Sequence, residues 1–249
     1  MDLGLEDKVC VVTGSTSGIG LETARQLREE GARIVTSGRG KEGIGDLHVA
    51  ADLAERGGPE GVVEAALAAF GRVDVLVNNV GWAEIHRFDE LVDDVWERSW
   101  QTNVMSAVRA LRIALPAMKA QGEGVVVNVA STAGKRPSAG MPEYSVTKAA
   151  MLSLSRLVAD LYAKDGIRCN AVTPGPTATE AWLGEGGLAD QQQGSREEVL
   201  AKVGAGRPLG RLAEPHEIAA VIVFLCSERA SYVTGAAWSA DGGTVPIII

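Results

Sequence analysis

Two residues that could carry acid–base chemistry, Tyr144 and Lys148, stand four positions apart in a stretch, Glu143–Lys164, that predicts a helix. Side chains at that spacing project from one helix face. A tyrosine hydroxyl has a pKa of about 10, and a neighbouring ammonium group favours its ionised form. Ser131 follows an apolar, β-branched run, Val125–Val129, that predicts a buried strand, so its hydroxyl can donate to the same substrate oxygen. The pattern favours chemistry on a carbonyl or alcohol; a chance pair on an exposed helix is the alternative.

A glycine-rich stretch near the N-terminus could bind phosphate. Lys8–Thr13 predicts a strand and Leu21–Glu30 a helix, with glycines at positions 14, 18 and 20 between them. Glycines allow a tight turn and a close approach of backbone N–H groups to a pyrophosphate, which then faces the positive end of the helix dipole. The spacing differs from Gly-x-Gly-x-x-Gly and lacks the lysine of a P-loop. A plain strand–turn–helix is the other interpretation.

Together these motifs resemble the short-chain dehydrogenases/reductases. The resemblance extends from Val9 to Asp241–Gly243 and rests on Thr13-Gly14-x-x-x-Gly18-x-Gly20, Asn78–Gly81, Asn103, Ser131, Tyr144-x-x-x-Lys148 and Pro174–Gly175, in the family's order and approximate spacing. It implies a single domain over residues 1–249, of α/β class, with a Rossmann-type doubly wound, mostly parallel seven-stranded sheet and helices on both faces. It also implies a nicotinamide cofactor and hydride transfer.

The resemblance further implies roles for individual residues. Tyr144 would be the general acid or base, and Lys148 would lower its pKa and hold the nicotinamide ribose. Ser131 would stabilise the substrate oxygen, and Asn103 would bend its helix and hold a water of a proton relay, unless it simply lies on a solvated face. Asp52 could equally be a turn or helix-capping residue. The implied cofactor-binding residues are Gly14, Ser15, Ser17, Gly18, Ile19, Gly20, Arg39, Asp52, Leu53, Asn79, Gly81, Tyr144, Lys148, Pro174, Gly175, Thr177 and Thr179.

The end of the second predicted strand, Ala32–Ser37, bears on the choice of cofactor. Rossmann enzymes that prefer NAD usually carry an acidic residue there. This chain has Gly38 followed by Arg39, whose guanidinium suits the extra phosphate of NADP. Ser17 stands where many NADP-preferring relatives have a basic residue. The sequence thus favours NADP(H) and leaves NAD(H) possible, and an exposed loop arginine is the alternative interpretation.

Three segments depart from the family pattern or lack a clear one. Residues 40–46 are too short and glycine-rich for a crossover helix, so we expect a bare loop and a more open adenosine end. Val80 replaces the usual alanine and would tighten the floor beneath the cofactor ribose. Residues 176–206 show no clear periodicity, which indicates a substrate lid. Trp182 and Leu183 are its candidate substrate contacts, with ordinary packing as the alternative.

The net charge, the lengths of the apolar runs and the cysteines indicate which classes of binding partner and which compartment to expect. The chain has 249 residues, a net charge of -8 and no apolar run of membrane-spanning length, so we expect neither nucleic acid nor membrane as a partner. Cys10, Cys169 and Cys226 have no metal-ligand spacing and indicate buried thiols in the cytoplasm. Apolar surface on the predicted helices and the Ile247–Ile249 tail predict a homo-oligomer, and the family resemblance implies a tetramer of two-fold symmetry.

Three other functions share part of this motif pattern. A 3-oxoacyl-(acyl-carrier-protein) reductase would use arginines to dock its acidic carrier, but Gly122 and Asp165 stand at the matching positions and Glu123 adds negative charge. Nucleotide-sugar epimerases share Tyr-x-x-x-Lys but have another glycine spacing and a larger C-terminal domain. A dinucleotide-sensing protein without catalytic activity would not need Asn103, Ser131, Tyr144 and Lys148 together. We therefore expect a small-molecule ketone or alcohol as substrate.

Overall fold

The strands within residues 2–246 form one parallel sheet. A computed structural model describes residues 2–246 and has seven strands in the order β3-β2-β1-β4-β5-β6-β7, every neighbouring pair being parallel. The order reverses between β1 and β4, as in a doubly wound fold. The strands are β1 (Val9–Val12), β2 (Arg33–Gly38), β3 (Leu47–Ala50), β4 (Val75–Asn78), β5 (Gly124–Val129), β6 (Ile167–Pro174) and β7 (Ala237–Ala240).

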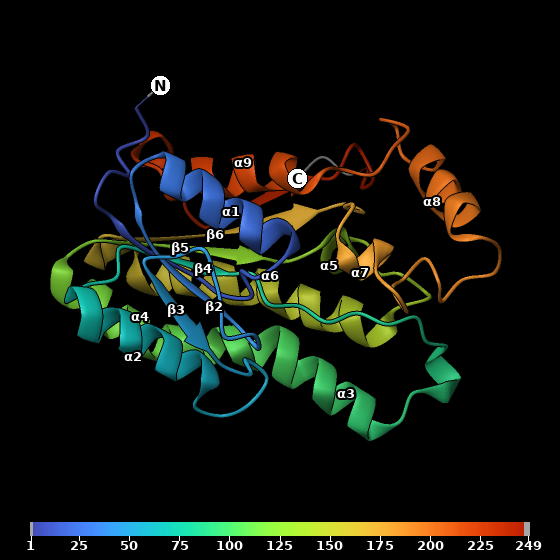
Figure 1. Cartoon of the computed structure of the whole chain (residues 1–249), viewed down its shortest axis with the longest axis horizontal. Helices are drawn as coiled ribbons and strands as arrows, with labels where there is room; N and C mark the ends of the chain where they lie inside the picture. Colours follow the sequence, from blue (N-terminus) through green and yellow to red (C-terminus); the bar gives the residue numbers. More distant parts are fainter. Residues whose placement is uncertain (1, 247–249) are drawn as a thin grey trace.

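Helices cover both faces of this sheet (Figure 1). Side chains alternate along β1: Val9 and Val11 join a core under one layer of helices, whereas Cys10 and Val12 join the core under the other. Both cores are apolar, so the strands are β-branched runs rather than alternating ones. The first layer contains α2 (Gly58–Phe70), α4 (Ser106–Gln121) and α6 (Pro142–Tyr162), and the second α1 (Gly18–Glu29) and α9 (Pro215–Cys226). The predicted seven-stranded α/β fold is confirmed.

The helical segment around Asn103 is interrupted. Two helices, α3 (Asp93–Trp100) and α4, are joined by a π-helical turn, Gln101–Met105, that contains Asn103. Such turns insert one extra residue and redirect the helix, and they often occur at functional sites.

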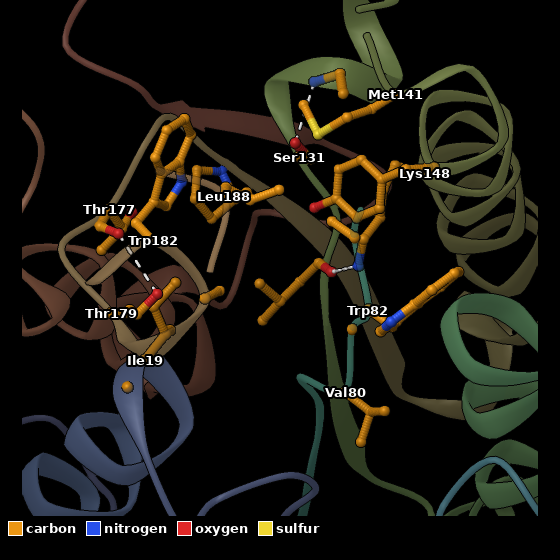
Figure 2. Close-up of a pocket in the computed structure, with 18 of the residues that line it drawn as sticks. Ile19, Val80, Trp82, Ser131, Met141, Lys148, Thr177, Thr179, Trp182 and Leu188 are labelled. Atoms are coloured by element: carbon orange, nitrogen blue, oxygen red, sulfur yellow. Dashed lines mark hydrogen bonds between the residues drawn. The ribbon is translucent and has the colours of Figure 1, made fainter. Parts of the chain in front are cut away.

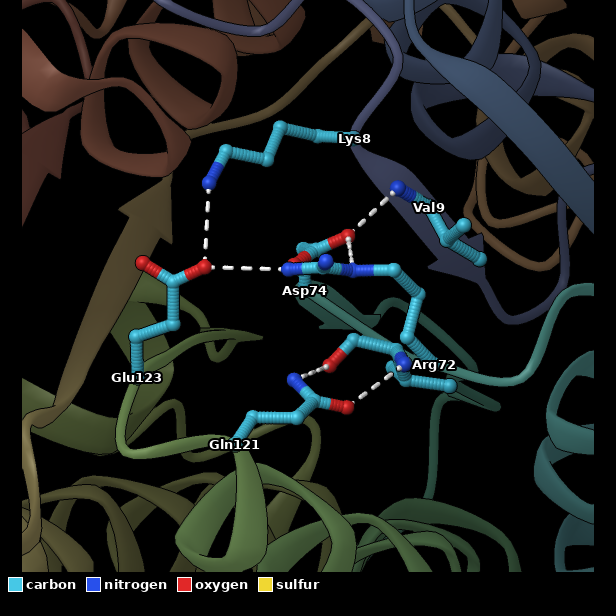
Figure 3. Close-up of polar contacts among 7 residues, drawn as sticks. Lys8, Val9, Arg72, Asp74, Gln121 and Glu123 are labelled. Carbon is cyan, nitrogen blue, oxygen red and sulfur yellow. Dashed lines mark hydrogen bonds and ion pairs between the residues drawn. The ribbon is translucent and has the colours of Figure 1, made fainter.

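Asp74 anchors the amino end of β4 (Figure 3). Its Oδ2 accepts a hydrogen bond of 2.8 Å from the backbone N–H of Val9, and both carboxylate oxygens accept from Arg72. Arg72 also pairs with Glu123 at 3.0 Å, and Glu123 with Lys8 at 3.2 Å. These charges tie β1, β4 and the start of β5 together at the edge opposite the carboxyl ends of the strands.

The connection between β2 and β3 is the short loop that the sequence predicted. No helix interrupts residues 39–46, and the loop lies against the edge of β2. Asp46 accepts a hydrogen bond of 2.7 Å from the N–H of Ile34, and Arg28 donates to the carbonyl of Ile44 at 2.7 Å. A Cβ on Gly45 would come within 2.5 Å of the carbonyl oxygen of Ile34, so a glycine is required for this contact. The loop is therefore short but well anchored.

Candidate active site

A cavity of about 1130 Å³ opens along the carboxyl ends of the strands (Figure 2). Residues that follow β1, β2, β4, β5 and β6 line it, as expected at the switch point of a doubly wound sheet. At one end lie the glycine-rich turn and Arg39; Ser131, Tyr144 and Lys148 line the cavity as well. Residues after β6, including α7 (Glu180–Leu183), contribute a further wall.

Lys148 is almost fully buried, with 2% of its surface exposed, and its Nζ donates a 2.9 Å hydrogen bond to the carbonyl of Val129. Its Nζ lies 5.6 Å from the ring centre of Tyr144. Burial lowers the pKa of Lys148 to about 8. Desolvation raises the pKa of Tyr144 above its ordinary value, and a hydrogen bond with Ser131 partly offsets that rise. The lowered tyrosine pKa that we expected from the neighbouring lysine is therefore not observed.

Ser131 is positioned by a short helix, α5 (Thr132–Lys135), which it caps. Its Oγ accepts a hydrogen bond of 3.1 Å from the N–H of Ala133. Gly134 lets this helix lie directly on α6, since a Cβ there would come within 2.7 Å of the backbone carbonyl of Lys148. The close contact of the two helices fixes the serine relative to Tyr144 and Lys148, the arrangement that the sequence spacing predicted.

Asn103 lies behind the cavity, with 1% of its surface exposed. Its Oδ1 accepts from the N–H of Trp82 at 2.7 Å, and its Nδ2 donates to the carbonyl of the same residue at 3.0 Å. The amide also donates to Ser99 and to Thr147 on α6. The expected bend is present as the π-helical turn. The Asn103 amide thus joins the backbone after β4, at Trp82, to Thr147 on α6. The predicted water relay stays a prediction.

The glycine-rich turn has the conformation that its sequence predicts. Gly14 and Gly18 have φ values of 62° and 54°, in the left-handed region that glycine favours. Ser17, the first residue before α1, makes no side-chain cap, so the N–H groups of the first helical turn remain available to an anion. A Cβ on Gly14 would come within 3.2 Å of Val80 Cγ2, so the valine lies directly under the turn.

Ser15 and Gly20, two of the implied cofactor-binding residues, do not line the cavity and support this turn from behind. Ser15 is fully buried; its Oγ donates to the carbonyl of Val12 at 2.7 Å and accepts from the N–H of Ser37 at 3.0 Å. Gly20 leaves room for Asn79, whose Nδ2 would lie 2.4 Å from a Cβ at that position. Asn79 uses this space to donate to the carbonyl of Gly14 at 2.9 Å. The first and fourth strands are thereby joined at their carboxyl ends.

At the adenosine end, Arg39 is exposed and lines the cavity, and its guanidinium forms no ion pair within residues 2–246. A Cβ on Gly38 would come within 2.6 Å of the side chain of Thr16, which also lines the cavity and was not predicted. Asp52 and Leu53 line it too. Oδ1 of Asp52 accepts a 2.9 Å hydrogen bond from the N–H of Ala54, so the turn role that the sequence left open is observed.

The segment after β6 supplies the other wall. Pro174, Gly175, Thr177 and Thr179 all line the cavity, and Thr179 lies 3.1 Å from where Gly18 would carry a Cβ. Residues 180–206, predicted without a clear pattern, contain α7 and α8 (Arg196–Ala205). Trp182 lines the cavity as expected, whereas Leu183 does not. Lining residues that the sequence did not reveal include Trp82, Met141, Leu188, Gln192 and Arg207.

A buried carboxylate stands next to the candidate acid. Glu143 is fully buried; its Oε1 lies 3.1 Å from Nδ1 of His86, and its Oε2 has no partner within residues 2–246. The N–H of His86 donates to the carbonyl of Gly140 at 2.9 Å. The pair thus joins the loop after β4 to the start of α6, where Tyr144 lies. No periodic signal in the sequence distinguishes this histidine.

Comparison with known proteins identifies the architecture. A family model described as enoyl-(acyl carrier protein) reductase matches residues 14–245. The uncharacterized oxidoreductase YvrD of Bacillus subtilis is 37% identical, over 98% of this chain and 99% of its own length. The L-rhamnose 1-dehydrogenase (NAD(P)(+)) of Azotobacter vinelandii is 38% identical, over 96% of this chain and 97% of its own. The crystal structure of L-sorbose reductase from Gluconobacter frateurii, complexed with NADPH and L-sorbose, superposes with a TM-score of 0.92 at 38% identity over 100% of both chains.

These matches cover nearly the whole chain, and the residues that carry the family pattern meet in one cavity at the carboxyl edge of the sheet. Within residues 2–246, no helix is long and apolar enough to cross a membrane. The chain belongs to the short-chain dehydrogenase/reductase family, and it is an NAD(P)-dependent oxidoreductase that acts on an alcohol or carbonyl of a small molecule.

Proposed function

We propose that the protein interconverts a small-molecule ketone and its secondary alcohol, with Tyr144 as general acid in reduction and general base in oxidation. The observation that carries the proposal is that Ser131, Tyr144 and Lys148 line one cavity with the uncapped start of α1. Hydroxyl groups at one end and free N–H groups at the other suit a carbonyl and a dinucleotide phosphate.

The residues present fit a nicotinamide dinucleotide. Gly14 and Gly18 leave space where side chains would block the approach of a pyrophosphate to α1. Thr177 and Thr179 are available for the carboxamide of the nicotinamide, and Lys148 for the neighbouring ribose hydroxyls. When bound, the cofactor supplies or accepts the hydride.

The proton is handled by the protein's own side chains. Tyr144 donates its hydroxyl proton to the substrate oxygen, and Ser131 donates a hydrogen bond that stabilises negative charge on that oxygen. Nζ of Lys148 lies 5.6 Å from the ring centre of Tyr144, so its positive charge would stabilise negative charge that develops on the tyrosine during proton transfer. Asn103 keeps Trp82 and α6 together, and we propose that it also holds the water that resupplies the proton. Residues 176–206 would act as the substrate lid of this single domain.

The preferred cofactor in this proposal is NADP(H). Support comes from Arg39, a cavity-lining arginine without an ion pair in the described chain, and from the absence of an acidic residue at position 38. The well-anchored loop after Arg39 favours a defined phosphate site. NAD(H) is the weaker alternative.

Substrate identity does not follow from the relatives, whose names cover a deoxy sugar, a ketose and an acyl-carrier-protein thioester. The carrier-protein alternative is weaker, because Gly122 and Asp165 stand where its docking arginines are expected and Glu123 adds negative charge. A panel of ketones and secondary alcohols, followed by nicotinamide absorbance with NADPH and NADH, tests the proposal. Consumption or formation of NADPH with one member is expected; no reaction across the panel in either direction would contradict it.

The proposal extends to assembly and compartment. Val146, Leu157 and Leu161 on α6 are about half exposed, which supports a homotetramer built on this helix. Light scattering at micromolar concentration tests this, and a monomer would contradict it. The predicted contribution of Ile247–Ile249 lies outside the described residues. Buried, free Cys10, Cys169 and Cys226 support the cytoplasm as the compartment.

A further inference from the structure

The cavity carries positive charge that the proposed chemistry does not use. Although the chain has a net charge of -8, five cationic side chains line the cavity against three acidic ones. Lys148 and Arg39 already have proposed roles, and Arg98 lies 4.2 Å from the ring centre of Trp82. Arg207 and Arg136 remain, and each lines the cavity without an ion pair to any residue in the range 2–246.

Arg207 follows α8 at the lid and is held by its backbone. Its N–H donates to the carbonyl of Gly204 at 2.9 Å, and Pro208 comes next in the chain. The Nε atom of Arg207 is buried and has no hydrogen-bond partner within the described chain. A buried donor on a charged group is costly when it lacks a partner. The side chain of Arg207 also lines the cavity and has no acidic partner among residues 2–246, so an anion bound in the cavity would supply the counter-charge that the described chain does not.

Arg136 adds positive charge from another part of the chain. It comes five residues after Ser131, at the end of α5, and its N–H donates to the carbonyl of Thr132 at 2.9 Å. The acidic residue that lines the cavity on α7, Glu180, does not neutralise either arginine. Its Oε2 lies beside Gly184, 2.7 Å from where a Cβ would be.

We propose that the substrate carries an anionic group, a carboxylate or a phosphate, which Arg207 binds at the lid while its carbonyl or alcohol lies at Tyr144. Arg136 contributes further attraction from the loop after Ser131. Guanidinium groups bind both anions through paired hydrogen bonds and remain charged at all relevant pH values. This inference rests on the proposed function, since it assigns the substrate class of the same cavity.

The first test compares matched substrates in the wild-type protein. Oxo acids of four to seven carbons are assayed against their methyl esters, and a ketose phosphate against the free ketose, with saturating NADPH. We expect kcat/KM to be at least about tenfold higher for one anionic series, which also identifies the anion. Equal values for charged and neutral partners in both series would overturn the proposal, and this comparison needs no variant.

The second test removes the guanidinium. Arg207→Gln should raise KM for the preferred anionic substrate about 10- to 100-fold and leave the neutral partner and the Kd of NADPH nearly unchanged. Lys202→Gln is the matched control, because Lys202 is an exposed cation on α8 that does not line the cavity. An equal loss for the charged and neutral substrates, or an equal loss in both variants, would count against a specific anion site.

A binding measurement separates this inference from the proposed function. Hexanoate and inorganic phosphate are added to the NADPH-loaded protein, and the melting temperature is followed. One of them should raise it in wild type but not in Arg207→Gln. If no compound is turned over but this difference is found, the proposed reaction fails and the anion site stands. If neither ion shifts the wild type, the anion site is refuted whatever the activity.

Discussion

The two walls of the active-site cavity are built in different ways. On the wall that carries the chemistry, Lys148 and Asn103 are buried, and their side chains bond to backbone groups of β5 and of the loop after β4. On the lid, most contacts are local: Ser195 caps α8, and the partly exposed Arg196 pairs with Asp190 six residues away at 2.6 Å. The first wall is fixed by the sheet, whereas the second is held by its own short helices.

This difference indicates which part of the site can move. Opening the chemistry wall would break buried hydrogen bonds and separate packed elements, whereas opening the lid exposes little buried backbone. We therefore expect substitutions on the first wall to change the rate of the reaction, and substitutions on the lid to change the affinity for substrate.

The largest effect is expected from Tyr144→Phe. The ring keeps its packing but loses the proton, so kcat should fall about 10²- to 10⁴-fold while the Kd of NADPH stays nearly the same. Tyr162→Phe, farther along α6 and outside the cavity, is the control and should keep wild-type activity. Absorbance assays with the best substrate of the panel measure both. More than about a tenth of the wild-type turnover in Tyr144→Phe would rule out the assigned acid.

The buried charge of Lys148 should appear in the pH dependence of stability. Its pKa is about 8 in the folded protein against 10.5 for an ordinary lysine. Between these values the unfolded chain binds a proton that the folded chain does not, so the free energy of unfolding rises with pH. Below pH 8 both states are protonated and the contribution is constant.

Lys148→Met removes this titration. The wild type should therefore gain about 2 kcal/mol of stability relative to the variant between about pH 7.5 and 10, the other groups cancelling in the comparison. Urea unfolding at several pH values measures the difference. A difference that stays constant with pH would mean that the ammonium group is better solvated than its burial indicates.

The chemistry wall could be predicted from the sequence because its residues are tied to regular elements. Tyr144 and Lys148 follow from helical spacing, and Ser131 from the end of a β-branched strand. Sequence spacing did not reveal how burial would act: the pKa of Tyr144 is raised, and the amide of Asn103 is taken up by Trp82. The partner of Asn103 lies 21 residues away in the chain, and Tyr144 is buried only once the elements around it have packed.

The lid could be predicted only as a segment. Its α7 has four residues and α8 ten, and neither shows a strong amphipathic pattern, because little of either is buried. Nothing in the sequence around Arg207 distinguishes it; only the structure shows that its side chain lines the cavity without an ion pair among residues 2–246. Glu143 and His86 were missed because their pairing joins the start of α6 to the loop after β4, 57 residues away in the chain.

Arg39 is an exposed residue that belongs to neither of these two walls, and it tests the choice of cofactor. If Arg39 binds the 2′-phosphate, Arg39→Ala should weaken NADPH about 10- to 150-fold and barely affect NADH, since one charge-assisted contact contributes about 1.5–3 kcal/mol. Fluorescence titration of both cofactors measures this, with Lys41→Ala in the same loop as the control. Equal NADPH affinity in wild type and Arg39→Ala would remove the basis for preferring NADP.

Gly38→Asp is a less direct route to NADH preference than the sequence indicated. The new Cβ would lie 2.6 Å from Thr16, so this side chain must rotate away first. The double substitution Thr16→Ala with Gly38→Asp should therefore shift the preference toward NADH further than Gly38→Asp alone. Titration of both cofactors into the two variants measures the shift, and identical preferences would show that Thr16 moves freely.

The smallest effect is expected where the lid touches the opposite wall. Gln191 Oε1 accepts a hydrogen bond of 2.8 Å from the N–H of Ile85, a residue that lines the cavity on the loop after β4. Its Nε2 donates to the carbonyl of Gly186 at 2.9 Å, so this glutamine joins the lid to the other side of the cavity. Loss of one such bond at an exposed position costs about 0.5–1.5 kcal/mol.

Gln191→Ala should therefore raise KM about 2- to 10-fold and leave kcat within about twofold of wild type. Gln193→Ala is a closely matched control, since it is exposed on the same segment and its side chain makes no hydrogen bond within residues 2–246. Hydrogen exchange over residues 180–206 should become faster in Gln191→Ala only, because the open lid is more populated. If kcat fell as much as kcat/KM, the lid would act on the chemical step itself, and the separation of the two walls into rate and affinity would not hold.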